Sequence, residues 1–223
     1  MTPPTAEPVI RIRDARCGRL TVHDGELALL LGPSESGKTT LMRAMVGVGG
    51  PLDEAFVMGR RVTAAAMAEV AGWVPEGDGV FLSETVWANV AGSRKSPVAA
   101  PDRAADALDL VGLADRAADP VAALSPGGRR RVALARAIAR RRPVLLIDGP
   151  LDPTLWVHFP MILDSLPWLR ATVIALSSAD ELIWKAQRIA MVGGGRILAE
   201  GSAAEMMASA DPVVREAWAW VTR

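Results

Sequence analysis

The residues whose types and spacing most clearly indicate a chemical role form a glycine-rich run that fits the pattern G-x-x-x-x-G-K-[ST]. The run before it, Glu26–Leu31, is short and apolar, which is typical of a buried parallel strand. The run after it has apolar residues at helical spacing from Lys38 to Val48. A loop between a strand and a helix offers backbone N–H groups and a helix N-terminus to an anion. The pattern predicts a phosphate-binding loop made of Gly32, Pro33, Ser34, Glu35, Ser36, Gly37, Lys38, Thr39 and Thr40.

Length and composition limit what surrounds this loop. The 223 residues are enough for one sizeable domain or one domain with two lobes. Lys plus Arg and Asp plus Glu number 25 each, so no overall field attracts nucleic acid or an acidic membrane surface. A single cysteine, Cys17, excludes an internal disulfide and suits a reducing cytoplasm. No apolar run approaches the roughly 18 residues that span a bilayer, so other chains must supply any membrane-spanning part.

The order of apolar runs predicts the fold. Buried strands alternate with helical segments, which favours an α/β fold with a mostly parallel sheet. We expect a disordered tail at 1–8, a core at 9–76 and 143–205, and a C-terminal helix at 211–222. Residues 77–142 change character and indicate a mainly helical lobe inserted into this core. In this lobe we expect Asp102 to cap a helix.

A second motif closes the lobe and carries a family resemblance. It consists of Leu124, Ser125, Pro126, Gly127 and Gly128, followed by an Arg-rich helix to about Arg140. Here the chain resembles the ATP-binding-cassette (ABC) family, which has LSGGQ followed by a helix of the RQRVALARA type. The spacings of both motifs to Asp148 are also similar to those of the family. The resemblance covers roughly residues 9–205 and implies a P-loop NTPase core with a small antiparallel β region.

The resemblance also implies cofactors and site residues. ATP and Mg²⁺ are the expected cofactors, with Mg²⁺ held by Thr39 and, through water, by Asp148. Glu76 stands where the family has a glutamine that contacts Mg²⁺ and water, and a carboxylate there remains a possible ligand. The family forms head-to-tail dimers, in which Ser125 and Gly127 are expected to contact the γ-phosphate of a nucleotide bound on a second subunit. Ser125 equally fits a helix N-cap, and both roles are compatible.

The residues that break the triphosphate in the family are missing. Gly149 follows Asp148 where the family has a glutamate that orients water and accepts its proton. Ser178 stands where the family has a histidine that contacts the γ-phosphate. Loss of a general base costs about 10²–10⁴-fold in rate. We therefore expect no intact catalytic residue, and a chain that binds Mg-ATP but hydrolyses it poorly.

Two further departures concern adenine and the dimer. No aromatic residue precedes the phosphate loop, so we expect the base to stack less well, or on Arg11, Arg13 or Arg16. The loop after Pro150 is short, and Asp152 is either the aspartate that contacts the other subunit or a displaced residue. The Arg-rich helix is expected to be a solvated face rather than a nucleic-acid site.

The expected partners follow from this pattern. A second, different nucleotide-binding subunit with intact hydrolytic residues would complete one working site, and membrane-spanning subunits would carry the transported substrate. The region of Trp73, Phe81 and Trp87 is expected either to receive a helix of a membrane subunit or to pack in the core. The chain would then lie on the inner face of the cell membrane. The alternative function is a regulatory or scaffolding subunit that senses ATP without hydrolysing it.

Overall fold

A computed structural model describes residues 7–15, 17–49, 52–77, 79–93, 96–178 and 181–222. Of the tail expected at 1–8, residues 1–6 lie outside the described residues. The chain forms two compact units, which we describe separately. Unit 1 comprises Met1–Ala71, Leu146–Gly149 and Arg170–Arg223, and unit 2 comprises Gly72–Leu145 and Pro150–Leu169. The lobe expected at 77–142 lies within unit 2, which also includes 72–76, 143–145 and 150–169.

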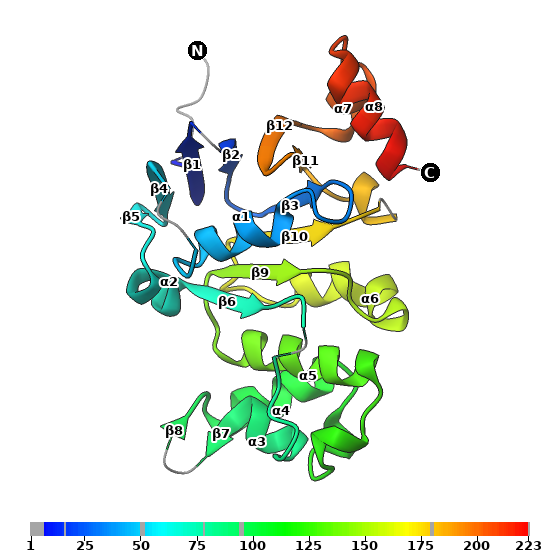
Figure 1. The fold of residues 1–223 in the computed structure, drawn as a ribbon. Helices are drawn as coiled ribbons and strands as arrows, with labels where there is room; N and C mark the ends of the chain where they lie inside the picture. Colours follow the sequence, from blue (N-terminus) through cyan, green and yellow to red (C-terminus); the bar gives the residue numbers. More distant parts are fainter. Residues whose placement is uncertain are drawn as a thin grey trace. The chain divides into compact units, whose positions relative to one another are not determined.

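The main sheet of unit 1 is mostly parallel, as the apolar runs predict. Within this unit its strand order is β12-β11-β3-β10-β9 (Figure 1). Strands β10, β3 and β11 pair in parallel, and β12 returns antiparallel from β11. The central strands are buried on both faces, which explains their unbroken apolar sequences. The strands are β3 (Glu26–Leu31), β9 (Val144–Asp148, of which residues 146–148 belong to unit 1), β10 (Ala171–Leu176), β11 (Arg188–Gly193) and β12 (Arg196–Gly201).

A smaller antiparallel sheet completes the β structure of unit 1, with the order β2-β1-β4-β5. Strand β1 alternates buried Ile10 and Ile12 with exposed Arg11 and Arg13, so one face packs on the core and the other faces solvent. The sequence does not predict strand β2, because this strand is only five residues long and only partly apolar. The strands are β1 (Ile10–Asp14), β2 (Gly18–Val22), β4 (Glu54–Val57) and β5 (Arg60–Arg61).

The helix after the phosphate loop is shorter than its apolar spacing predicts. It is α1 (Lys38–Met45), and Val48 lies beyond it with 73% of its surface exposed. Gly47 has φ +73°, and the N–H groups of Gly47 and Val48 donate to the carbonyls of Ala44 and Arg43. This left-handed glycine cap satisfies the last carbonyls and ends the helix. The prediction that the helical segment extends to Val48 is therefore wrong.

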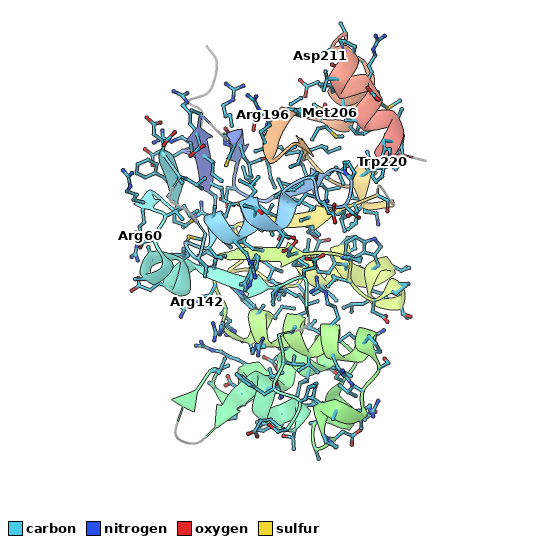
Figure 2. The ribbon with its side chains drawn as sticks, in the orientation of Figure 1. Arg60, Arg142, Arg196, Met206, Asp211 and Trp220 are labelled. Carbon is cyan, nitrogen blue, oxygen red and sulfur yellow. The ribbon has the colours of Figure 1, made fainter. Side chains whose placement is uncertain are left out.

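The other helices of unit 1 follow their capping residues. Ser202 and Glu205 form a capping box at the start of α7. The C-terminal helix expected at 211–222 is α8, with Asp211 as its N-cap and Pro212 as its first residue. Figure 2 shows Asp211 at the start of this helix and Trp220 near its end. The helices are α2 (Ala64–Val70), the 3₁₀ turn η3 (Glu181–Trp184), α7 (Ala203–Met207) and α8 (Pro212–Val221).

Unit 2 is mainly helical. Its longest helix, α5, begins at Pro126 after Ser125 and runs to Ala139. The prediction that Asp102 caps a helix is wrong: Ala100 is the N-cap of α4, Pro101 follows, and Asp102 lies in the first turn. Helix α6 was not predicted, since it contains Pro160 and lacks a clear polar face. The elements are β6 (Ala71–Val74), α3 (Val86–Ala91), β7 (Gly92–Ser93), β8 (Ser96–Pro97), α4 (Pro101–Leu110), η1 (Ala114–Arg116), η2 (Val121–Ala123), α5 (Pro126–Ala139) and α6 (Pro153–Asp164).

Candidate functional site

The predicted phosphate loop lies in unit 1 between β3 and α1. Its lysine folds back over the loop: Lys38 Nζ donates to the carbonyls of Gly32 and Pro33 at 2.7 Å each, and lies 3.4 Å from Ser36 Oγ. Gly37 is the N-cap of α1 and makes no side-chain cap, so a bound anion can take that place. The lysine and the helix N-terminus thus converge on the loop, as phosphate binding requires.

The turn between β11 and β12 packs closely against this loop. Gly195 N–H donates to the carbonyl of Ser36 at 2.7 Å. A Cβ on Gly37 would lie 2.6 Å from Cα of Gly195, and a Cβ on Gly32 would lie 2.1 Å from the carbonyl oxygen of Val192. Both loop glycines are therefore needed for close packing, and Gly37, with φ +101°, is also needed for its backbone conformation. The sequence alone does not predict this support, because the turn and the loop lie far apart along the chain.

A hydroxyl and a carboxylate meet beside the loop. Thr39 Oγ1 donates to Asp148 Oδ1 at 3.2 Å, and Asp148, at the end of β9, is only 2% exposed. Mg²⁺ is commonly held by one or two protein oxygens together with phosphate oxygens and water. Thr39 and Asp148 fit this requirement, because both present oxygen ligands next to the phosphate loop. They would hold the ion, whose positive charge would offset the negative charge of the phosphates.

The signature motif lies in unit 2 at the start of α5. Ser125 is the N-cap, and its Oγ accepts from the N–H of Gly128 at 3.1 Å, which confirms the capping role. A Cβ on Gly127 would lie 2.6 Å from Oδ2 of Asp152. Leu124 is buried beneath the turn, and Pro126 occupies the first helical position. The helix start is thus rigid, with Ser125 exposed on its outer side.

Comparisons with known proteins identify the family. A family model described as "ABC transporter" matches residues 18–152. The chain belongs to the ABC transporter family. It is 33% identical over 205 residues to the sulfate/thiosulfate import ATP-binding protein CysA of Brucella melitensis, covering 84% of this chain and 56% of that protein. It is 36% identical over 199 residues to the Fe(3+) ions import ATP-binding protein FbpC of Streptomyces avermitilis, covering 84% and 57%.

A solved structure shows the same fold. CbiO1 from Clostridium perfringens, described as part of the ABC transporter complex cbiONQ, aligns with a TM-score of 0.77 at 20% identity, covering 95% of this chain and 94% of that chain. The predicted ABC ATPase fold is thereby confirmed. The chain spans just over half the length of the curated relatives it matches. Within the described residues, every helix is too short or too polar to pass through a bilayer.

Gly149 and Ser178 occupy the positions where the family resemblance predicts a glutamate and a histidine. Gly149 directly follows Asp148, has φ +89°, and donates its N–H to the carbonyl of Ala175 at 2.9 Å. Ser178 is exposed just after β10 ends, and Gly32 N–H donates to the Leu176 carbonyl at 3.3 Å. The loop, Gly149 and the end of β10 therefore gather at one edge of the sheet in unit 1, where neither Gly149 nor Ser178 offers a strong base.

Glu76 belongs to unit 2, so its proposed Mg²⁺ contact stays a prediction. It is exposed after β6, and its carbonyl accepts from Arg130 at 3.3 Å. Arg130 is only 7% exposed and also donates to the carbonyls of Pro75 and Pro150. The expectation of a solvated basic face is therefore wrong for Arg130. The hydrogen bonds of its guanidinium link the loops after β6 and β9 to α5.

Asp152 is engaged within its own unit. One carboxylate oxygen accepts from Arg131 and from the N–H groups of Thr154 and Leu155, so that Asp152 caps α6. The hydrogen bond from Arg131 is the main cause of the lowered pKa of Asp152. The sequence left open whether Asp152 reaches another subunit. Here its carboxylate ties the start of α6 to the signature helix.

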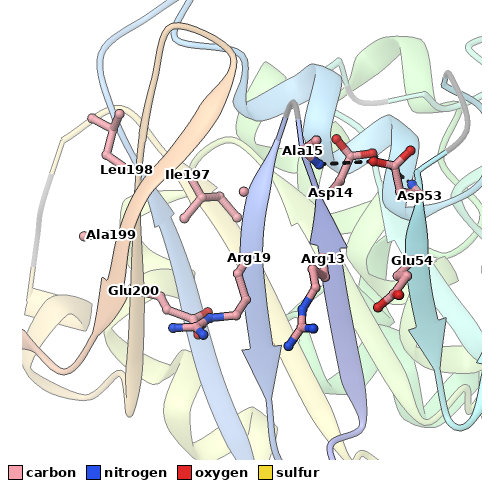
Figure 3. A pocket seen from close by; sticks show the side chains of 11 residues that line it. Arg13, Asp14, Ala15, Arg19, Asp53, Glu54, Ile197, Leu198, Ala199 and Glu200 are labelled. Carbon is pink, nitrogen blue, oxygen red and sulfur yellow. Dashed lines mark hydrogen bonds and ion pairs between the residues drawn. The ribbon is translucent and has the colours of Figure 1, made fainter.

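The arginines considered for adenine have different surroundings. The guanidinium of Arg11 lies 5.1 Å from the ring centre of Phe56, so it already stacks on an aromatic side chain. Arg13 lines an open pocket of about 580 Å³ together with Arg19, whose Nε pairs with Glu200 at 3.2 Å (Figure 3). Arg16 lies outside the described residues. Stacking of adenine on Arg13 stays a prediction.

A second pocket of about 660 Å³ lies wholly in unit 2. Trp73, Phe81 and Arg136 line it. Phe81 is 64% exposed, yet its backbone is fixed because buried Asn89 accepts from its N–H at 2.8 Å and donates to its carbonyl at 3.0 Å. Arg136 lies 5.9 Å from the Phe81 ring and donates to the carbonyl of Gly79 at 2.8 Å. Burial is the main cause of the lowered pKa of Arg136.

Proposed function

We propose that this ABC domain binds Mg-ATP at Gly32–Thr40 and hydrolyses it poorly, acting in a dimer that drives or regulates transport. The observation that carries the proposal is Gly149. It stands beside an intact phosphate loop and an intact Thr39–Asp148 pair, but it has no side chain to activate water. Binding rests on groups that are present, whereas hydrolysis rests on groups that are absent.

The proposed dimer is a head-to-tail pair with a different nucleotide-binding chain. The signature start is well formed, with Ser125 exposed and Gly127 kept, whereas the groups that hydrolyse nucleotide at the chain's own loop are missing. A partner with intact hydrolytic residues would place its nucleotide against Ser125. The nucleotide on Lys38 would remain bound and stabilise the dimer.

Membrane-spanning subunits are the other proposed partners, with the pocket of Trp73, Phe81 and Arg136 as their docking surface. Phe81 combines an exposed aromatic ring with a fixed backbone, and such rigid aromatic side chains are common at interface centres. The chain would then lie at the inner face of the membrane. Import is the favoured direction, since the curated relatives named above are import proteins.

A second candidate is a regulatory or scaffolding subunit that senses ATP without hydrolysing it. Gly149 and Ser178 favour this function for the isolated chain. The native complex separates the two candidates. A second nucleotide-binding chain with Glu and His at the two positions, together with membrane-spanning chains, supports transport, and a complex without membrane chains supports regulation.

The test of the site uses the purified chain, with Lys38→Ala as a matched control. We expect Mg-ATP binding by calorimetry in the wild type and none in Lys38→Ala. Single-turnover hydrolysis should be slower than that of ordinary ABC ATPases by about 10²–10⁴-fold. Turnover at the ordinary rate refutes impaired hydrolysis, and an absence of binding in the wild type refutes the nucleotide site.

A further inference from the structure

Glu35 has an unusual backbone conformation in the middle of the phosphate loop. Among the described residues, the non-glycine residues with positive φ are Glu35 at +65°, Met58 at +52° and Arg141 at +49°. Met58 and Gly59 form the two-residue turn between β4 and β5, where left-handed residues are the norm. Arg141 follows the end of α5, another common place for this conformation. Neither explanation applies to Glu35.

The conformation of Glu35 fits a loop built to bind anions. Alternation of right- and left-handed residues turns successive N–H groups toward one point and makes a concave anion site. Glu35 and Gly37 are both left-handed, and Ser36 between them donates its N–H to the Pro33 carbonyl at 3.1 Å. Glycine adopts this conformation without strain, whereas glutamate does not. The backbone conformation at Glu35 therefore favours binding of a phosphate, whereas the side chain at the same position is negatively charged.

The charge of Glu35 opposes the charge of the expected ligand. The loop Gly32–Thr40 contains one cation, Lys38, and one anion, Glu35. Glu35 is exposed, and no hydrogen bond or ion pair of its side chain is present in the described part of the chain. Its carboxylate is therefore not neutralised by a neighbouring cation. A polyphosphate that enters the loop meets this negative charge within a few residues of Lys38.

We infer that Glu35 weakens nucleotide binding at this loop, and weakens it more for a triphosphate than for a diphosphate. The inference rests on the proposed nucleotide site and names the residue that sets its ATP-to-ADP selectivity. Coulomb repulsion grows with ligand charge, and Mg-ATP carries one more negative charge than Mg-ADP. Glu35 thus shifts the site toward ADP, which suits a loop whose γ-phosphate contact is replaced by exposed Ser178.

Three substitutions separate charge from backbone strain. Glu35→Gln removes the charge and keeps the strained conformation. Glu35→Asn removes the charge and tolerates positive φ. Glu35→Gly also relieves the strain, but glycine adds freedom to the unfolded chain. Strain acts mainly on folding, whereas charge acts on binding, so unfolding and calorimetric measurements report the two effects separately.

The experiment measures the affinities of Mg-ATP and Mg-ADP for the full chain at low ionic strength. We expect Glu35→Gln to bind Mg-ATP about three- to tenfold more tightly, with a smaller gain for Mg-ADP. Glu35→Asn and Glu35→Gly should show the same shift in the ATP-to-ADP ratio. Raising the salt concentration to about 1 M should reduce these gains, since screening then acts over about 3 Å. Only Glu35→Asn should clearly raise the unfolding temperature.

Two controls make the result decisive. Glu216→Gln removes an exposed acid from α8 and should leave both affinities unchanged. Lys38→Ala should abolish binding of both nucleotides. If the wild type binds neither nucleotide, the proposed function fails. If the wild type binds, and Glu35→Gln leaves the ATP-to-ADP ratio unchanged or tightens both ligands equally, the inference about Glu35 is wrong while the proposed function stands.

Discussion

Gly149 has φ +89°, in the region where residues with a Cβ are strained. A restored glutamate at this position would either adopt the strained conformation, at about 1–2 kcal/mol, or displace the backbone that bonds to Ala175. In both cases its carboxylate would be misplaced for activating water. We therefore expect Gly149→Glu to lower the unfolding temperature without restoring hydrolysis.

Gly149→Ala is the matched control for this prediction, because it introduces the same strain without a carboxylate. Both variants should lose similar stability in denaturant unfolding, and both should hydrolyse ATP as slowly as the wild type in single-turnover assays. A hydrolysis rate in Gly149→Glu about 10²-fold above that of Gly149→Ala would show that the backbone accepts a working base.

Asp152 provides a second test at a single residue. Arg131 and the N–H groups of Leu155 and Thr154 favour its charged form and lower its pKa in the folded state. A lowered pKa contributes stability above the unfolded value of about 3.9, and this contribution is lost as pH falls through the folded-state pKa. Asn caps helices as well as Asp does, so Asp152→Asn should remove the ion pair and keep the cap.

Urea unfolding measures the Asp152 effect. At pH 7 we expect Asp152→Asn to be less stable than the wild type, and Asp152→Ala to lose about 1 kcal/mol more because it also loses the cap. The gap between wild type and Asp152→Asn should shrink steadily below about pH 4. A gap that stays constant from pH 7 to pH 3 would mean that the Arg131 pair contributes nothing to stability.

Among the elements, the β11–β12 turn holds the phosphate loop in shape. A Cβ on Gly37 would meet Cα of Gly195 at 2.6 Å, and both atoms belong to backbone that has little room to move. Gly37→Ala should therefore push the turn and the loop apart and abolish Mg-ATP binding. Gly194→Ala is the control: it also has positive φ, at +57°, but a Cβ there meets nothing within 4 Å.

Calorimetry and thermal unfolding distinguish these two glycines. Gly194→Ala should lose some stability through strain and keep its nucleotide affinity. Gly37→Ala should lose affinity even at temperatures where it remains folded. Equal affinities in the two variants would show that the contact between turn and loop does not shape the binding site.

The sequence predicted those elements whose signals are local. The loop between a strand and a helix at 32–37 and the N-cap Ser125 depend on residues within a few positions of each other, and the structure contains both. Phosphate binding at this loop stays a prediction. Helix α6 was missed because it is apolar on several sides and contains Pro160. The end of α1 was misplaced because Gly47 acts through its backbone, which an apolar spacing does not reveal.

The contacts that hold the site together could not be predicted, because they join distant parts of the chain. Arg130 bonds to the carbonyls of Pro75 and Pro150, and its surrounding sequence reads as an exposed basic run. The β11–β12 turn touches the loop although more than a hundred residues separate them along the chain, since β11 pairs with β3. Such contacts depend on strand order, which the sequence alone does not specify.

At the scale of the whole molecule, the proposed nucleotide site and the proposed docking surface lie in different units. Unit 1 carries the phosphate loop, Asp148 and Gly149, and unit 2 carries the signature start and the pocket of Phe81. Nucleotide binding at the loop and docking of a membrane partner on Phe81 should therefore be separable by substitution. Phe81→Ala should leave Mg-ATP affinity unchanged, and it should release the membrane-spanning chains from the native complex purified in detergent.

The structure explains why this loss should be specific. Phe81 is 64% exposed, so its truncation costs the isolated chain little stability, usually within about 0.5 kcal/mol. In a complex the same ring would be buried, and removal of a central aromatic side chain commonly costs 2 kcal/mol or more, which is roughly a 30-fold weaker contact. Trp184→Ala is the control, since Trp184 is equally exposed, at 67%, but lies in unit 1. Release of the membrane chains by Trp184→Ala and not by Phe81→Ala would move the docking surface to unit 1.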